Sequence, residues 1–195
     1  MMNRTPPRQH GTASVEFAMI VIVLLTLIFG VIELARLMYV YNTLQDATRR
    51  AAAGAAVTDW RDQGAMDLVR QAAIFRTSPG ELILGAPVTD GHVAIDYLAI
   101  IRNSDNSLAL SPIPPGEMPS CPARNRVTCT ANQNDPHCVR LVRVRICAPG
   151  NAGACDPVYF QPLFGLFPST ARLPTSTTIV PAETLGYVAG FAPCP

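Results

Sequence analysis

Hydrophobic residues form one long run near the N-terminus of the chain. The run covers residues 17–32, and Thr26 is its only notably polar side chain. Extended back to Ala13, the run would make about 30 Å of α-helix at ~1.5 Å per residue, which is the thickness of the hydrocarbon core of a bilayer. The pattern therefore predicts a transmembrane helix over about residues 13–32.

The periodicity then changes to that of an amphipathic helix. Charged residues such as Glu33 and Arg36 fall on other faces than the apolar stripe. One continuous helix over residues 12–57 would be roughly 65–70 Å long. We expect its second half to pack on its own domain, into a filament, or both. The stripe consists of Leu34, Leu37, Met38, Tyr41, Leu44, Thr48, Ala51, Ala52 and Ala55.

The remaining residues, 58–195, predict a small α+β domain. Two segments alternate between apolar and polar residues as half-buried strands do. A small antiparallel sheet resting on the long helix would bury its apolar face. The predicted elements are a helix from Asp59 or Arg61 to about Arg76, strands over 92–101, 139–147 and 175–180, and an extended Pro-rich loop over 111–122.

Composition excludes several classes of function. The 15 basic residues are all Arg, and with 14 acidic residues they give a net charge of +1. Without Lys the chain has neither a Schiff-base lysine nor a P-loop, and without a basic excess no nucleic-acid partner is expected. The sequence holds no catalytic motif, so we expect no enzyme, no cofactor and no metal site.

Six cysteines are confined to the last 75 residues. Their spacing contains no C-x-x-C pair of the kind that structural zinc sites use. An even number in one region favours disulfides in an oxidising compartment, with zinc ligation and free thiols as the alternatives. The pairing cannot be read from the sequence. The disulfide candidates are Cys121, Cys129, Cys138, Cys147, Cys155 and Cys194.

The N-terminal segment 1–11 has three explanations. It carries Arg4 and Arg8 and no acidic residue. A signal peptide would be removed after the apolar run, but the helical pattern continues there without a small-x-small site. A signal anchor would keep the N-terminus in the cytoplasm. A leader cut before the apolar run would leave that run in the protein.

Glu16, directly before the run, bears on this choice. A carboxylate in an apolar segment is costly in lipid and points to a function. It could pair with a new N-terminal ammonium, or it could simply reach the membrane interface at the start of the helix.

The stretch from Gly11 to Phe17 resembles the prepilin peptidase site of the tight-adherence (Tad/Flp) branch of type IV pilins. The pattern G-x-A-x-V-E-F, the apolar run, Glu33-Leu34-Ala35-Arg36 and the Ala-rich segment 47–56 are together similar to the TadE-like pseudopilin family. The resemblance covers about 45 residues. It implies cleavage between Gly11 and Thr12, with Glu16 and Phe17 setting the register between subunits.

The resemblance implies a minor pilin of a Tad-type pilus assembly or secretion system, acting structurally in pilus initiation, assembly and adherence. The implied partners are the prepilin peptidase, other pilins and pseudopilins, the inner-membrane assembly platform and the lipid bilayer. The chain would cross the bacterial inner membrane once, with a cytoplasmic N-terminus and a periplasmic domain, before incorporation into an extracellular pilus. The alternatives are an uncleaved, signal-anchored periplasmic scaffold or binding protein, and a membrane-anchored periplasmic thiol or metal enzyme.

Two other clusters each have two interpretations. Arg140, Arg143 and Arg145 form a basic row that is either the solvated face of a strand or a site for an acidic partner. The segment 156–170 is rich in aromatic residues, which either pack in the core or form a patch that faces a partner or a membrane.

Overall fold

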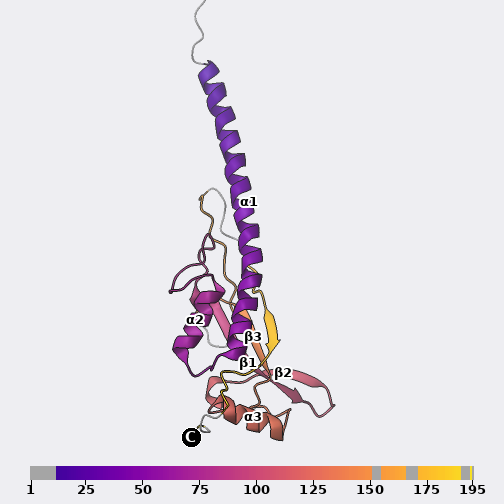
Figure 1. Cartoon of the computed structure of the whole chain (residues 1–195). Helices are drawn as coiled ribbons and strands as arrows, with labels where there is room; N and C mark the ends of the chain where they lie inside the picture. Colours follow the sequence, from indigo (N-terminus) through magenta and orange to yellow (C-terminus); the bar gives the residue numbers. More distant parts are fainter. Residues whose placement is uncertain (1–11, 151–154, 166–170, 190–193, 195) are drawn as a thin grey trace, which may run out of the picture.

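The computed structural model describes residues 12–150, 155–165, 171–189 and 194. One long helix, α1, projects far beyond the other elements at its N-terminal end, and those elements gather around its C-terminal half and beyond its C-terminal end (Figure 1). The helices are α1 (Thr12–Val57), α2 (Gln63–Ala73) and α3 (Pro122–Ala131), and the strands are β1 (Val93–Arg102), β2 (Leu108–Pro112), β3 (Leu141–Ile146) and β4 (Thr178–Pro181).

The four strands form one antiparallel sheet in the order β2-β1-β3-β4. In β3 the residues Val142 and Val144 are fully buried, whereas Arg143 between them is partly exposed. This alternation lets one face of the sheet pack on α1, as the sequence predicts. The expected α+β fold, with a long N-terminal helix and a small antiparallel sheet, is confirmed.

The core lies between this sheet and the second half of α1. Val40, Leu44 and Ala51 are completely buried there. The Ala-rich segment from Ala47 to Ala56 allows the sheet to approach the helix closely, because alanine side chains take up little room. Thr48, also buried, shares a hydrogen bond of 2.9 Å with Thr178 on β4.

The last part of the chain caps the end of α1. The final carbonyl groups of a helix lack partners within it. Here the backbone N–H groups of Glu183 and Leu185 donate to the Ala56 carbonyl at 3.1 and 3.0 Å. The cap also explains a close approach at Gly186, whose φ of +79° and contact with Asp59 leave no room for a side chain. The C-terminal end of α1 is thus joined to the segment that follows β4.

Several element boundaries differ from the sequence expectation. The helix α2 spans Gln63–Ala73 instead of extending from Asp59 or Arg61 to about Arg76. It is capped by Asp62, whose carboxylate accepts from the Ala65 N–H at 3.0 Å. The Pro-rich loop expected over 111–122 is narrower, since Pro112 ends β2 and Pro122 begins α3. Neither β2 nor α3 was predicted.

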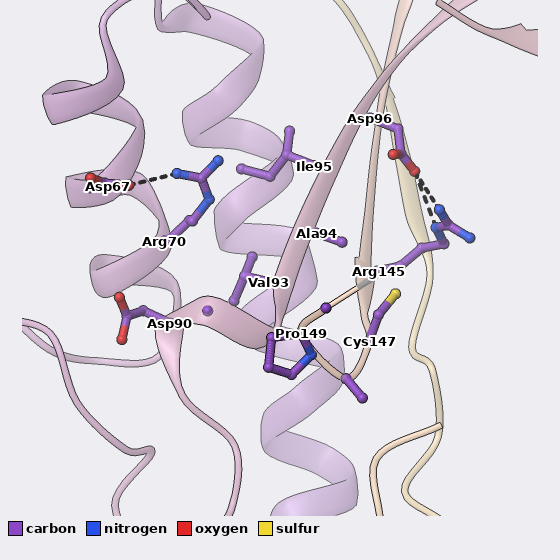
Figure 2. Close-up of a pocket in the computed structure, with 13 residues that line it drawn as sticks. Asp67, Arg70, Asp90, Val93, Ala94, Ile95, Asp96, Arg145, Cys147 and Pro149 are labelled. Atoms are coloured by element: carbon purple, nitrogen blue, oxygen red, sulfur yellow. Dashed lines mark hydrogen bonds and ion pairs between the residues drawn. The ribbon is translucent and has the colours of Figure 1, made fainter. Parts of the chain in front are cut away.

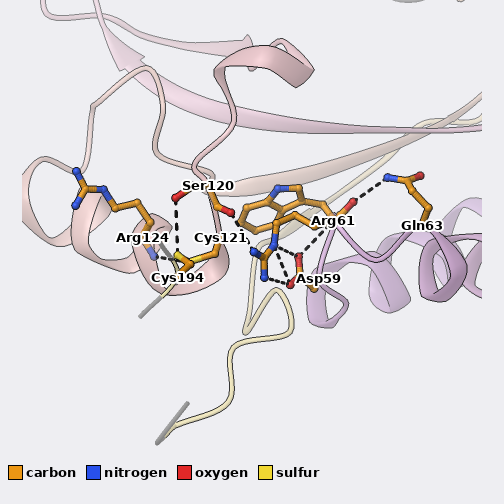
Figure 3. Close-up of polar contacts among 8 residues, drawn as sticks. Asp59, Arg61, Gln63, Ser120, Cys121, Arg124 and Cys194 are labelled. Carbon is orange, nitrogen blue, oxygen red and sulfur yellow. Dashed lines mark hydrogen bonds and ion pairs between the residues drawn. A yellow bond between two sulfur atoms is a disulfide. The ribbon is translucent and has the colours of Figure 1, made fainter. Parts of the chain in front are cut away.

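All six cysteines are paired in the structure. The disulfides are Cys121–Cys194, Cys129–Cys138 and Cys147–Cys155. Two of them close short loops on either side of β3. The third ties the C-terminus to the start of α3, and Figure 3 shows it beside the Asp59–Arg61 ion pair. Such staples support a small domain in an oxidising compartment.

Candidate functional site

The first half of α1, residues 13–32, is largely uncovered by the rest of the chain, and we call it the bare half. Its large apolar side chains are exposed, for example Phe17 at 70%, Val23 at 68% and Leu24 at 53%. Its most hydrophobic 18-residue window has a mean hydropathy of 2.8 and no buried residue, so the helix is long and apolar enough to cross a membrane. A soluble protein rarely exposes an apolar surface of this size, and this surface therefore needs lipid or other helices around it.

Glu16 lies on the surface of this bare half. Its side chain is exposed, and it has no hydrogen bond or ion pair with another residue in the described part of the chain. Phe17 beside it is exposed as well. Gly11 and the side chain of Thr12, which would flank the predicted cleavage, lie outside what the structure describes. A partner for the Glu16 carboxylate would have to come from beyond the described residues or from another molecule.

A buried arginine marks the point where the bare half ends. Arg36 is only 6% exposed, and its guanidinium donates to the carbonyls of Leu84 (2.7 Å), Ala86 (3.2 Å) and Gln161. It also lies over the ring of Phe160, 4.7 Å from the centroid. One side chain therefore fastens two distant loops to the helix. The rigid fork of arginine donors suits this task better than a lysine ammonium would.

Glu33, one turn earlier, completes this junction. It is also 6% exposed, and its Oε1 accepts from the backbone N–H groups of Leu163 and Phe164. Its Oε2 lies 3.7 Å from Arg36 Nη1 and has no hydrogen-bond donor among the described residues. A buried carboxylate is tolerable only with such compensation. We call Glu33 and Arg36 the polar junction.

These features lie within the part of the chain that resembles a known family. Residues 11–53 match the family model described as "TadE-like protein". The chain carries a TadE-like domain. No curated protein and no solved structure matches the chain.

The TadE-like domain contains both the bare half of α1 and the polar junction, and it ends four residues before the helix does. The sequence predicts that Glu33 and Arg36, two of the residues that carry the family resemblance, lie on other faces of the helix than the packed stripe. The structure buries both. The signal that could have revealed this is an i, i+3 pair of opposite charges directly after an apolar span.

Outside the TadE-like domain, two of the three arginines of the predicted basic row lie on β3 and are not simply solvated, while Arg140 precedes the strand. Arg143 and Arg145 both bind the Asp96 carboxylate on β1, at 2.9 and 2.8 Å. Arg145 also lines a cleft of about 570 Å³ between α2 and the sheet (Figure 2). Across this cleft Arg70 is paired with Asp67 at 2.7 Å. Both arginines that line this cleft, Arg70 and Arg145, are thus already paired with acidic residues of the chain.

A second polar cluster lies where α1 ends (Figure 3). Arg61 binds the Asp59 carboxylate at 2.7 Å and donates to the carbonyl of Ser120 at 3.1 Å. Burial raises the pKa of Asp59, but the hydrogen bonds and charge of Arg61 outweigh it and hold that pKa below its ordinary value. The cluster anchors the α1–α2 turn to the start of α3. No group of three or more His, Cys, Asp or Glu residues suited to a metal occurs among the described residues.

Proposed function

We propose that this chain is a minor pilin, or pseudopilin, of a Tad-type pilus assembly or secretion system. Its role would be structural, in pilus initiation or assembly and in adherence. One observation carries the proposal: a single helix has a bare apolar half that requires an environment outside the chain, while its other half is the spine of the folded domain. The TadE-like match covers this same helix and so supports the same role.

The segments before and after the apolar helix support one orientation of the chain in the membrane. The apolar helix is consistent with a membrane anchor, and the disulfides suggest an extracytoplasmic domain. Arg4 and Arg8 precede the helix without an acidic residue, which favours a cytoplasmic N-terminus. We infer a single pass through the bacterial inner membrane, with the domain in the periplasm until the subunit enters a filament.

We further propose that a prepilin peptidase cuts between Gly11 and Thr12. This would remove two Arg and no acidic residue, which changes the side-chain charge from +1 to −1, with 13 basic against 14 acidic residues. The new ammonium at Thr12 would stand near the Glu16 carboxylate of its own chain or of a neighbour. In lipid such a pair neutralises two charges that are each costly alone. Other pilins and the inner-membrane assembly platform would be the partners.

The intact mass of the chain from its native membrane tests this processing. A chain that begins at Thr12, with no free thiol on labelling, is the expected result. A chain that still begins near Met1 would instead favour an uncleaved, signal-anchored scaffold. Free thiols or a bound metal would reopen the possibility of a periplasmic enzyme.

Substitution of Glu16 tests its role in assembly. We expect Glu16→Ala and Glu16→Gln to be cleaved but to enter the filament or initiation complex poorly, because the new ammonium loses its partner. The matched control is Asp46→Asn, which removes a half-exposed carboxylate from the same helix outside the bare half. Co-purification with the other pilins measures incorporation, and normal incorporation of both Glu16 variants would exclude this role.

A further inference from the structure

The aromatic-rich segment 156–170 divides between two environments. Phe160 is buried against the polar junction, as core packing requires. Leu163 is 57% exposed, and the Phe164 ring packs on the Phe29 ring of α1 with the centroids 4.5 Å apart. Residues 166–170 lie outside the described part. Of the part that is not buried in the core, the structure describes residues 161–165.

The height of this loop along α1 is fixed by its contacts. Phe29 belongs to the last turn of the predicted span 13–32, and Glu33 accepts from the N–H groups of Leu163 and Phe164. The loop therefore lies beside residues 29–33, within about one helical turn (~5 Å) of the end of the span. The interfacial region of a bilayer extends roughly 5–7 Å beyond its hydrocarbon core on each side. Residues 161–165 thus lie at the depth of the lipid headgroups.

A second loop rises beside the helix on the same end of the domain (Figure 1). Its residues Ile83 and Leu84 are 58% and 62% exposed, and the Leu84 carbonyl is held by Arg36. Between α1 and the loop at 160–162 lies an apolar cleft of about 260 Å³, lined by residues that include Leu34 and Leu37. The end of the domain nearest the span is therefore surrounded by exposed apolar side chains.

The two loop segments that lie nearest the span carry no charge. Residues 161–165 and 82–88 contain no charged side chain. The two charged residues of α1 at this depth, Glu33 and Arg36, are turned onto the domain and are 94% buried. A surface that met water or a charged partner would not need this arrangement. Beside a membrane span, it removes the charges that would oppose contact with lipid.

We infer that residues 161–165, together with Ile83 and Leu84 of the second loop, contact the surface of the bilayer that α1 spans. The inference rests on the proposed membrane anchoring. These apolar loop segments then hold the domain against the membrane, as interfacial segments do, and the domain is not suspended above it on a flexible stem. Extraction of a subunit toward a filament must break this contact as well as withdraw the helix.

Tryptophan scanning in vesicles tests the contact. The full-length chain contains one tryptophan, Trp60, which lies beyond the far end of α1 and serves as an internal reference about 38 Å of helix from the span. We would compare Leu163→Trp with Leu24→Trp in the span and Leu110→Trp on β2, three exposed leucine positions. Each variant is reconstituted in phosphatidylcholine vesicles with or without bromine atoms on the upper acyl chain.

The expected result is that the added emission of Leu163→Trp is blue-shifted and mostly quenched by the brominated lipid, like that of Leu24→Trp, while Leu110→Trp keeps its emission. Quenching at Leu24→Trp alone would overturn the inference and leave the membrane anchor intact. Absence of quenching at Leu24→Trp would overturn the anchor itself. Quenching at Leu163→Trp that disappears as the protein-to-lipid ratio rises would assign the surface to another copy of the chain and would also overturn the inference.

Discussion

The two halves of α1 are both rich in apolar residues, yet they lie in opposite environments. Leu24 in the first half is 53% exposed, whereas Leu44 in the second half is fully buried. The first half is apolar on all sides. The second half is apolar mainly along one stripe, with Gln45 and Arg49 on its exposed side. A domain that packs on one side of a helix can bury only that side. A helix that is apolar all around therefore needs an apolar environment on every side.

The difference shows that the polar junction, rather than hydrophobicity alone, separates the two environments. Leu34 and Met38, beyond the span, are exposed at 55% and 56%, so the loss of exposed apolar residues is gradual. The change in packing is sharp, because Glu33 and Arg36 bind loops that are 48 to 131 residues away in the chain. These contacts determine where the domain begins on the helix.

The largest effect is expected from Arg36→Met, which removes the boundary between the halves. The change leaves the Glu33 carboxylate buried without a cation and three carbonyls without a donor, so the domain should lose about 3–5 kcal/mol of unfolding free energy. Denaturant unfolding in detergent micelles, followed by near-UV circular dichroism, measures this loss.

The double variant Glu33→Gln/Arg36→Met should recover part of the loss, because no buried charge remains. The matched control is Arg50→Met on the same helix, where the partner Asp46 is half exposed and the ion pair contributes less than about 1 kcal/mol. If Arg36→Met and Arg50→Met lowered the free energy of unfolding equally, the polar junction would stabilise the domain no more than an exposed ion pair does.

A smaller but more direct contrast comes from the same substitution in each half. Leu44→Ala removes a fully buried side chain and should destabilise the domain by about 2–5 kcal/mol, whereas Leu24→Ala should leave domain unfolding unchanged. The same unfolding measurement in micelles compares them. A loss at Leu24→Ala as large as at Leu44→Ala would show that the bare half contributes to the domain after all.

Local pattern was sufficient to predict the helix and the two central strands. The continuous apolar run, the stripe through Leu44 and Ala51, and the alternation of Val142 and Val144 are all periodic signals within single elements. The predicted stripe is buried only from Leu44 onward, at Leu44, Thr48, Ala51, Ala52 and Ala55, whereas Leu34 and Met38 of the same stripe are exposed.

Contacts between distant segments were not predictable from pattern. The strand β2 is short, and its Leu108 and Leu110 are exposed, so it lacks a clear alternation toward the core. The helix α3 has little apolar periodicity, and it is joined to the rest of the domain by two disulfides, at Cys121 and Cys129, and by two hydrogen bonds between Asn125 and the Val139 backbone. The burial of the polar junction depends on loops that only the folded chain brings to α1.

The smallest predicted effect is a dependence of the domain's stability on pH, which arises from His92 in the folded domain and has no counterpart in the bare half. Burial lowers the pKa of His92 below its ordinary value, although the Asp90 charge and a hydrogen bond with Thr89 act in the opposite direction. Below about pH 6.5 the unfolded chain therefore takes up a proton that the folded domain resists. Stability should fall as the pH drops through this value and level off once it is below the folded pKa.

The variant His92→Asn should show less of this pH dependence. The asparagine carbonyl can accept the Thr89 N–H bond that His92 Nδ1 accepts at 3.0 Å, but it does not titrate. Unfolding at about pH 7.5 and 5.5 would be compared with that of His137→Asn, whose histidine side chain is 51% exposed. If His92→Asn kept the full dependence and His137→Asn lost it, the titrating group would be the exposed histidine, and burial in the domain half would not be the cause.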